Sequence, residues 1–378
     1  MKEDWKECKL GDVVEINQNS FSEKENWLFV NYLDTGSITE NKISEIQYIN
    51  LIDEKLPSRA KRKVKKNSII YSTVRPNQKH FGIIKSFPEN FLVSTGFAVL
   101  DVNKKIAFPD FVYYYLIQNE NTESLHAIAE QTTSAYPAIK PSDIADISIN
   151  LPPLATQQKI AQILSSLDDK IELNNKINDN LEQQAQAIFK SWFVDFEPFG
   201  GKMPKGWKMG KLSDLITVKY GKDHKKLEDG SYPVYGSGGI MRYVDKFLYD
   251  KESVLIPRKG TLNNVFYINE PFWSVDTMFY TEMTKENLAK FVYFFVKGKD
   301  LNSMNAGSAV PSMTTEILNA IEVVIPSDEY LEKFENIVSP MFKQIKQCII
   351  ENENLASIRD TLLPKLMSGE IGVDEVKV

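Results

Sequence analysis

Apolar residues in the middle of the chain recur at alternating spacings of four and three positions. The stretch from Leu151 to Phe193 carries this pattern, with mainly Ile and Leu at the spaced positions. Such spacing places the apolar side chains on one stripe of a helix and is typical of a coiled-coil seam. Pro152 and Pro153 stand at the start, where a helix tolerates proline. We therefore predict a helical segment over residues 152–197.

The same pattern returns near the end of the chain and predicts a second long helix over residues 326–372. Arg359 interrupts its apolar stripe, and we expect the neighbouring Ile358 to turn inward instead. Each stripe is polar near its middle, and a buried Asn in a seam fixes the register and the partner of a helix. The predicted seam residues are Ile160, Leu164, Leu167, Ile171, Asn174, Leu181, Ile188, Phe334, Val338, Met341, Ile345, Leu355 and Leu362.

A helix of about 40 residues is roughly 60 Å long, at ~1.5 Å rise per residue. Its apolar stripe extends far beyond what one small domain can cover. Because the second helix of the same chain is the nearest available partner, we predict that the two helices pair as an antiparallel coiled coil. The alternative is that each helix packs on its own globular domain.

The chain is one structural unit used twice. A shift of 174 residues places Ser134–Pro137 on Ser308–Pro311 and continues without a gap into the two helices. An earlier aromatic segment, Phe111–Leu116, matches Phe291–Val296 at an offset of 180, so the first copy carries extra residues, all of them before Ser134. A part of constant length suits a spacer, whereas a part with variable loops suits recognition.

The regions before the helices have the pattern of mixed α/β domains. Short β-rich runs, such as residues 67–71 and 253–256, alternate with turn signals, and aromatic helices are expected at 108–119 and 288–297. The predicted fold class is therefore α/β, with two mixed α/β domains that are each followed by a long helix. The expected boundaries are residues 1–151 for the first domain, 152–197 for the central helix, 198–206 for a Pro/Gly linker, 207–325 for the second domain and 326–372 for the C-terminal helix.

Basic side chains cluster in the predicted loops of both domains. The segment Lys55–Lys66 holds seven positive and no negative residues. Arg, Lys, Asn and Gln suit contacts with phosphates and base edges, and glycine lets the backbone approach a phosphate, although a run of charge is often just a solvated face. The candidate DNA-contacting residues are Lys61, Arg62, Lys63, Arg75, Asn77, Lys79, His80, Thr133, Ser134, Tyr136, Lys222, His224, Lys225, Ser237, Arg242, Arg258, Lys259 and Ser308.

Composition and missing motifs narrow the function further. The net charge of −6 argues against a uniformly basic nucleic-acid coat but allows local basic faces. The sequence has no run of 18 apolar residues and no signal-peptide core, and its two cysteines show no metal spacing, so we expect a reduced, cytoplasmic setting away from any membrane. Phosphate-binding, dinucleotide-binding and HExxH zinc motifs are absent. We therefore expect no catalytic residues, cofactor or metal, with any chemistry supplied by another protein.

Two stretches resemble conserved regions of the specificity (S) subunits of type I restriction–modification systems. The first is Ile149–Ile160, which contains Leu-Pro-Pro-Leu-Ala-Thr-Gln-Gln, and the second is Leu362–Ile371. Tyr235–Gly239 and Ile256–Gly260 are similar to segments of target recognition domains. Because the duplicated layout agrees as well, the resemblance covers essentially the whole chain.

The resemblance implies that each globular domain is a target recognition domain that reads one half of a bipartite site in double-stranded DNA. It also implies that the helices set the length of the unread spacer. Partners would be two adenine methyltransferase (M) subunits and, optionally, ATP-driven restriction (R) subunits, which would hold the methyl donor and ATP. The second helix starts with Pro326–Tyr330 and lacks the Pro-Pro-Leu-x-x-Gln-Gln pattern, so the two methyltransferase contacts need not be equivalent.

Two other functions fit parts of the sequence. A coiled-coil scaffold that never binds DNA fits the helices and the net charge but leaves the basic loops without a role. A nuclease would use Glu375 and Lys377, which have the spacing of an ExK motif in the C-terminal tail.

Overall fold

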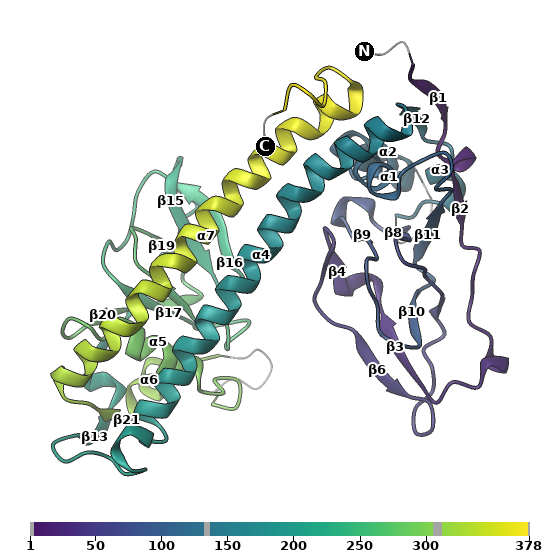
Figure 1. Ribbon diagram of the computed structural model, residues 1–378. Helices are drawn as coiled ribbons and strands as arrows, with labels where there is room; N and C mark the ends of the chain where they lie inside the picture. Colours follow the sequence, from purple (N-terminus) through teal and green to yellow (C-terminus); the bar gives the residue numbers. More distant parts are fainter. Residues whose placement is uncertain (1–3, 132–136, 305–311, 377–378) are drawn as a thin grey trace. The chain divides into compact units, whose positions relative to one another are not determined.

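The structure of the chain is a computed structural model, and it describes residues 4–131, 137–304 and 312–376. Figure 1 shows the elements along the chain. None of the helices in these three ranges is long and apolar enough to cross a membrane. The mixture of short strands, short helices and two long helices confirms the predicted α/β fold class.

The chain divides into two compact units. Unit 1 consists of Met1–Leu173 with Glu351–Val378, and unit 2 consists of Asn174–Ile350. The two long helices, α4 (Leu154–Phe193) and α7 (Asp328–Ser368), are each continuous, and each contributes residues to both units. The division therefore falls in the polar middle of each helix.

In the described part of unit 1, two four-stranded sheets form the body of the unit. The first has the order β2-β11-β8-β9 with antiparallel neighbours, and the second has the order β6-β3-β10-β7 with β3 and β10 parallel. Helices α1 and α2 lie beside the start of α4 (Figure 1). The bounds are β1 (Lys6–Lys9), η1 (Leu10–Asp12), β2 (Val14–Ile16), η2 (Glu23–Glu25), β3 (Phe29–Leu33), η3 (Thr35–Ser37), β4 (Ile38–Thr39), β5 (Lys42–Ile43), β6 (Gln47–Asn50), β7 (Ala60–Arg62), β8 (Ile69–Ser72), η4 (Pro76–Gln78), β9 (Phe81–Ile83), β10 (Phe91–Ser94), β11 (Phe97–Val102), α1 (Pro109–Leu116), α2 (Asn119–Glu130), α3 (Pro141–Ala145) and β12 (Ser148–Leu151).

In the described part of unit 2, a four-stranded antiparallel sheet has the order β14-β20-β17-β18, and a three-stranded sheet has the order β16-β15-β19. The aromatic helix α5 packs on the first of these sheets, which places its Phe and Val side chains in the core of the unit. The bounds are η5 (Glu197–Phe199), β13 (Lys208–Lys211), η6 (Leu212–Asp214), β14 (Ile216–Tyr220), β15 (Asp229–Gly236), β16 (Gly239–Val244), β17 (Ser253–Pro257), β18 (Phe266–Ile268), β19 (Trp273–Ser274), β20 (Met278–Met283), α5 (Ala289–Lys297), α6 (Thr315–Ala320) and β21 (Glu322–Ile325).

The two units repeat the same design, which confirms the duplication. In both, the first strand pairs antiparallel with the strand that precedes the long helix: β1 with β12, and β13 with β21. The turn after the first strand is also the same. The backbone N–H of Lys9 donates to Asp12 Oδ2 at 2.9 Å, and that of Lys211 donates to Asp214 Oδ2 at 2.8 Å. Helix α2 and the β4–β5 hairpin have no counterpart among the described helices and strands of the second copy.

The start of α4 is held by the side chain of Gln157, which is 1% exposed. Its Oε1 accepts a hydrogen bond from the Phe108 N–H at 2.8 Å, and its Nε2 donates to the Pro152 carbonyl at 2.9 Å. These bonds connect α4 to the beginning of α1 and satisfy backbone groups that would otherwise be unpaired. The second copy has the buried Leu331 at the matching position, so the difference between the two helix starts changes a polar anchor into an apolar one.

Within unit 1, the first half of α4 packs antiparallel against the last part of α7. Ile160 and Leu164 share a buried cluster with Leu363 and Leu366. Beyond this cluster, Asp168 of α4 pairs with Arg359 of α7 at 2.7 Å and also accepts a hydrogen bond from the Tyr114 hydroxyl of α1 at 2.6 Å. The order of these contacts along the two helices, rising in α4 and falling in α7, defines the antiparallel direction.

Within unit 2, the last half of α4 packs against the first half of α7 through aromatic rings. Phe193 of α4 lies 5.2 Å from Phe334 of α7 and 5.0 Å from Phe291 of α5, measured between ring centroids. Phe189 contacts the same two rings at 6.1 and 5.4 Å. This cluster joins the helix pair to the globular part of the unit.

The predicted seam residues differ in how deeply they are buried. Six are at most 3% exposed, and the other seven are half-buried. Near the end of α4 the buried positions are Ala185, Phe189 and Phe193, which follow a spacing of four. The fully buried seam residues are Ile160, Leu164, Leu167, Asn174, Phe334 and Val338, and the half-buried ones are Ile171, Leu181, Ile188, Met341, Ile345, Leu355 and Leu362.

The prediction that Ile358 turns inward is wrong, because its side chain is 48% exposed. Arg359 occupies the interface instead, and it can do so because Asp168 neutralises it. Burial alone disfavours the charged guanidinium, but the hydrogen bond and the charge of Asp168 outweigh burial and raise the pKa of Arg359 above its usual range.

We predict that Arg359→Met lowers the free energy of unfolding by about 1–3 kcal/mol, because the half-buried carboxylate of Asp168 then loses its charged partner. Urea denaturation measures this change. Lys159→Met is the matched control, since Lys159 lies on the same helix as Asp168 and pairs with Asp374 at 3.2 Å in an exposed position. Equal effects of the two substitutions would show that the Asp168–Arg359 pair has no special role.

Candidate nucleic-acid interface

The basic segment of unit 1 is only partly a loop. Lys61 and Arg62 lie on strand β7, so the prediction that they belong to a loop is wrong. Lys61 is exposed, and its ammonium forms no hydrogen bond or ion pair with any residue that the structure describes. Arg62 is half-buried, and burial lowers the pKa of its guanidinium below the usual value. Only the first of these two side chains is presented freely to a ligand.

Lys63 is engaged within unit 1. Its ammonium pairs with the carboxylate of Glu25 and lies 5.0 Å from the centre of the Trp27 ring. The hydrogen bond from Lys63 lowers the pKa of Glu25 below its usual range. Because its charge is already neutralised, Lys63 has less capacity than Lys61 to bind a phosphate.

A second group of candidates surrounds the short helix η4 (Pro76–Gln78). Arg75 and Lys79 flank it with positive φ angles of 49° and 55°, and both Arg75 and Asn77 are exposed. Lys79 pairs with Glu40 at 2.9 Å, and His80 Nδ1 lies 2.6 Å from the Ile38 carbonyl. Left-handed backbone is unfavourable for residues such as Arg and Lys, so Arg75 and Lys79 mark a constrained turn.

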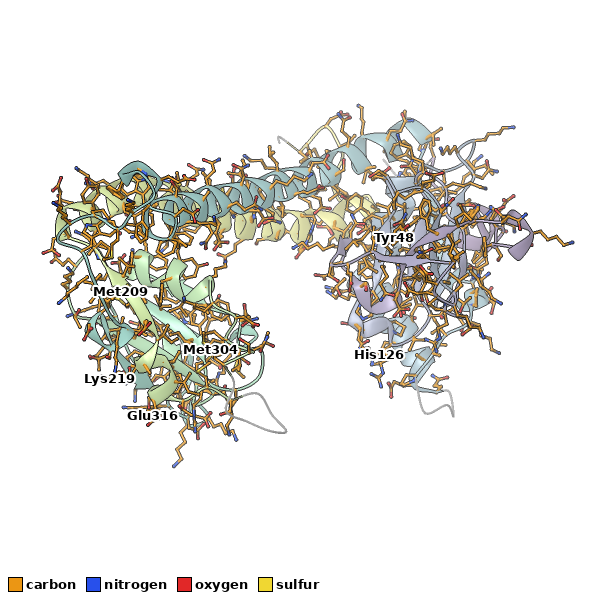
Figure 2. The ribbon with its side chains drawn as sticks, turned by 90° about the horizontal axis from the view of Figure 1, so that it is seen from below. Tyr48, His126, Met209, Lys219, Met304 and Glu316 are labelled. Atoms are coloured by element: carbon orange, nitrogen blue, oxygen red, sulfur yellow. The ribbon has the colours of Figure 1, made fainter. Side chains whose placement is uncertain are left out.

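In unit 2, the candidates lie on three segments that come together. Lys219, a basic residue on β14 that precedes the candidates in the chain (labelled in Figure 2), pairs with Glu282 at 3.4 Å. The segment after β14 is fixed by a hydrogen bond from the Lys222 N–H to the Ser274 carbonyl at 2.7 Å. The guanidinium of Arg258, at the end of β17, lies 5.4 Å from the centre of the Tyr220 ring. Lys219 is therefore paired with an acid, whereas the side chain of Lys222 is exposed.

The remaining candidates of unit 2 have different surroundings. Arg242 on β16 donates to the Leu227 carbonyl at 3.0 Å and to Asp229 at 2.8 Å, which are contacts within its own sheet region. Lys259 is exposed. The predicted residues Thr133, Ser134, Tyr136 and Ser308 lie outside the residues that the structure describes.

The turn that follows β8 in unit 1 has the same backbone arrangement as the turn that follows β17 in unit 2. Val74, after β8, forms a bridge with Ala138, and Lys259, after β17, forms a bridge with Ser312. The next residue has a positive φ in both copies, 49° at Arg75 and 86° at Gly260. The repeat therefore keeps the backbone of this turn and changes its side chains, which is the arrangement expected of a recognition surface.

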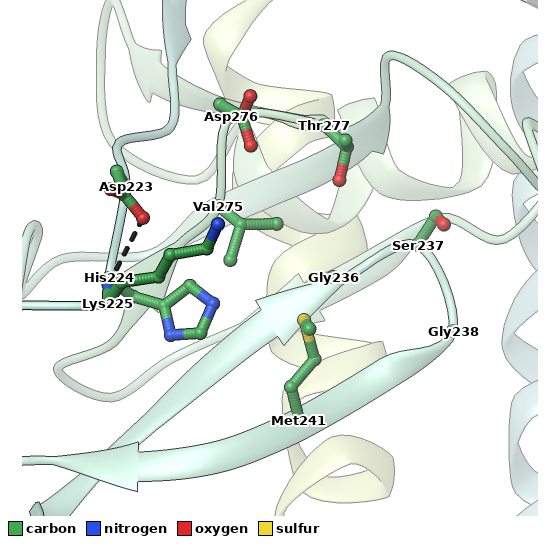
Figure 3. A pocket seen from close by; sticks show the side chains of 10 residues that line it. All are labelled: Asp223, His224, Lys225, Gly236, Ser237, Gly238, Met241, Val275, Asp276 and Thr277. Carbon is green, nitrogen blue, oxygen red and sulfur yellow. Dashed lines mark hydrogen bonds between the residues drawn. The ribbon is translucent and has the colours of Figure 1, made fainter.

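An open cavity of 660 Å³ in unit 2 is lined by three of the candidates, His224, Lys225 and Ser237. One wall is formed by the segment after β14 and the turn before β20, and the other by the β15–β16 hairpin (Figure 3). Its lining residues are Asp223, His224, Lys225, Gly236, Ser237, Gly238, Met241, Val275, Asp276 and Thr277. A cavity with this mixture of donors and acceptors suits recognition of a polar ligand edge.

Three of the lining residues were predicted from the sequence: His224, Lys225 and Ser237. Asp276 and Thr277 were missed, because they lie about 50 residues after His224 and Lys225 in the chain and carry no basic charge. They reach the cavity through the parallel pairing of β19 with β15. No sequence signal short of this pairing could have identified them. No group of three or more His, Cys, Asp and Glu in the described residues is placed to hold a metal ion.

Comparison with known proteins gives a consistent result. The family model described as "Type I restriction modification DNA specificity domain" matches residues 2–183 and again 204–359. The HindI specificity subunit of a type I restriction enzyme from Haemophilus influenzae is 29% identical, and the match covers 97% of this chain and 100% of the relative. The MjaIX specificity subunit from Methanocaldococcus jannaschii is 25% identical over 99% of this chain and 95% of the relative.

The fold has also been observed before. The crystal structure of a type I restriction–modification system S subunit from M. genitalium matches with a TM-score of 0.58 and 20% identity, and the match covers 96% of each chain. The family model matches the chain twice, in agreement with the internal repeat.

We predict that Lys61→Ala weakens the binding of a nonspecific DNA duplex and lowers the slope of log K against log salt concentration by about one, because one phosphate contact is lost. Lys63→Ala should change this slope by less than half as much, since Glu25 already neutralises Lys63. Fluorescence anisotropy at several salt concentrations measures both slopes. A larger effect of Lys63→Ala would contradict this assignment.

Proposed function

This chain belongs to the family of type I restriction–modification specificity subunits, and we propose that it reads an asymmetric, bipartite site in double-stranded DNA. In this proposal, each unit contacts one half of the site. The chain directs two partner adenine methyltransferase subunits to that site, with or without restriction subunits. The methylation and cleavage reactions then take place on the partners, and this chain supplies the choice of sequence.

The observation that carries the proposal is the duplicated turn on two units that share two continuous helices. The turn has the same backbone bridge in both copies but different side chains. Position 74 is Val and its counterpart at 259 is Lys, and position 75 is Arg and its counterpart at 260 is Gly. Because base edges are distinguished by the donors and acceptors that face them, different side chains favour different half-sites.

The two long helices are proposed to set the distance between the half-sites. Helix α4 has 40 residues and α7 has 41, and each contributes residues to both units. A helix cannot be stretched without breaking its hydrogen bonds, so its length fixes a separation. Half-sites on one face of B-DNA recur about every 34–36 Å, and a fixed separation therefore selects a particular spacer.

The two ends at which the long helices begin are proposed to contact the methyltransferase subunits differently. Gln157 anchors the start of α4 through two hydrogen bonds, whereas Leu331 occupies the matching position at the start of α7. Both anchors are buried, but the exposed residue that follows is Gln158 in the first copy and Glu332 in the second, so the two local surfaces differ. The two partner subunits are therefore expected to bind with unequal affinity.

Methylome sequencing tests the proposed function. Cells that express this chain with its methyltransferase subunit should acquire N6-methyladenine at a new, asymmetric, bipartite motif that is absent from cells expressing the methyltransferase alone. A motif consisting of one continuous block would contradict the division of reading between two units. Absence of any new motif, with a stable complex of chain and methyltransferase, would overturn the proposal and leave a scaffold.

We predict that inserting about one helical turn, four residues, into both α4 and α7 lengthens the unread spacer without changing either half-site. Both insertions belong in the polar middle, close to Asn174 and Asn352, where the apolar clusters of the units are not disturbed. The spacer is read from the methylated motif.

The matched control is the same insertion between Gly200 and Gly201, whose surroundings are open and which lie outside both long helices. This control should leave the spacer unchanged. A spacer that does not respond to the helix insertions would disprove the role of the helices as the spacer-setting element.

A further inference from the structure

Two acidic side chains line the cavity of unit 2, and they differ in what they do there. Asp223 Oδ1 accepts a hydrogen bond from the Lys225 N–H at 3.1 Å, so its carboxylate stabilises its own turn (Figure 3). Asp276 uses its backbone carbonyl to accept from Arg258 at 3.1 Å. Its carboxylate is exposed and forms no hydrogen bond or ion pair with any residue that the structure describes. The fold therefore provides a role for one carboxylate and none for the other.

The fold does not require an acid at this position. The Thr73 N–H donates to the Gly96 carbonyl, and the Arg258 N–H donates to the Thr277 carbonyl, both at 2.8 Å. These matching hydrogen bonds make Gly96 and Thr277 equivalent, so Asp276 corresponds to Thr95 in the first copy. The same turn is thus built with a neutral side chain in one unit and a carboxylate in the other.

A carboxylate is also unfavourable for general DNA binding at this place. Lys225 lines the cavity, Lys222 precedes the lining residue Asp223, and the Lys259 N–H donates to the carbonyl of the lining residue Thr277 at 3.2 Å. All three side chains are exposed and can attract phosphates. A negative charge among them reduces that attraction at every sequence. The negative charge of Asp276 therefore opposes nonspecific binding of DNA. Such a repulsive charge is useful where the same side chain discriminates between ligands.

The chemistry of the carboxylate identifies what it can discriminate. An ionised carboxylate accepts hydrogen bonds and donates none. In the major groove, adenine presents its N6 amino group and cytosine its N4 amino group, whereas guanine and thymine present acceptor oxygens at the corresponding position. A carboxylate is attracted by the first two and repelled by the second two.

We propose that Asp276 is a specificity-determining residue of unit 2, whose carboxylate accepts a hydrogen bond from the exocyclic amino group of an adenine or a cytosine. This inference rests on the DNA-reading function proposed above. It assigns one position of one half-site, on one strand, to a single side chain. The base at that position is A or C, and its pairing partner on the other strand is T or G.

Asp276→Asn provides the test, in cells that express the full chain with its methyltransferase subunit. The amide keeps the shape of the side chain but has a donor as well as an acceptor, so it tolerates all four bases. We expect one position, in one half of the methylated motif, to become degenerate, with discrimination reduced roughly 5- to 150-fold. The other half-site and the spacer should not change. Asp276→Ala, which removes the acceptor, should relax the same position.

Asp250→Asn is the control for the change in net charge. Asp250 is exposed and precedes β17, at the opposite end of that strand from Arg258 and Lys259. The substitution removes the same negative charge from the same unit but lies away from the cavity. The motif obtained with this variant should be that of the unsubstituted chain.

The possible results separate this inference from the function on which it rests. If the unsubstituted chain gives no bipartite motif, the proposed function fails. If it gives such a motif and Asp276→Asn gives the same motif with undiminished discrimination, the assignment of Asp276 fails alone. Loss of methylation that is equal at all sequences, from a variant with an unchanged circular dichroism spectrum, would also overturn it, because a base contact affects one position.

Discussion

The burial of the apolar stripes of two continuous helices is the constraint on which the rest of the structure depends. Each helix is too long for one small domain to cover, and each unit covers half of it. In unit 1 the stripe is buried mainly by aliphatic residues such as Leu164 and Leu366, and in unit 2 by rings such as Phe193 and Phe334. The core of each unit therefore includes its own half of both helices.

Polar contacts then fix the orientation of each globular part on its half of the helices. In unit 1, Asp168 connects α4 with both Arg359 and Tyr114. In unit 2, the ammonium of Lys290 on α5, which is 4% exposed, pairs with Glu335 of α7 at 2.5 Å and with Glu252 at 3.1 Å. Apolar packing tolerates small rotations, whereas buried ion pairs require one geometry. We interpret these contacts as the reason why a short aromatic helix keeps a single orientation on the helix pair in each unit.

On this fixed scaffold, the basic residues have two kinds of role. Lys63 and Arg242 are neutralised by acids of their own units. Lys61 and Lys259 are exposed, and position 259 is one at which the repeat changes its side chain, from the Val74 of the first copy. An overall net charge of −6 is compatible with DNA binding because the free positive charges are local and act over a Debye length of about 8–10 Å. In our proposal, a small number of side chains select the DNA sequence, and one of them, Asp276, is an acid.

The sequence by itself determined the two long helices, the duplication and the fold class, because each depends on the spacing of residues along the chain. It did not determine which charged side chains are free. Arg359 enters the interface and Ile358 does not, since Asp168, 191 residues away, supplies a partner. Asp276 and Ser237 meet at one cavity because β19 pairs with β15, a contact that no local pattern encodes. Periodicity is a local property that survives in the sequence, whereas the pairing of charges depends on distances that exist only after the chain has folded.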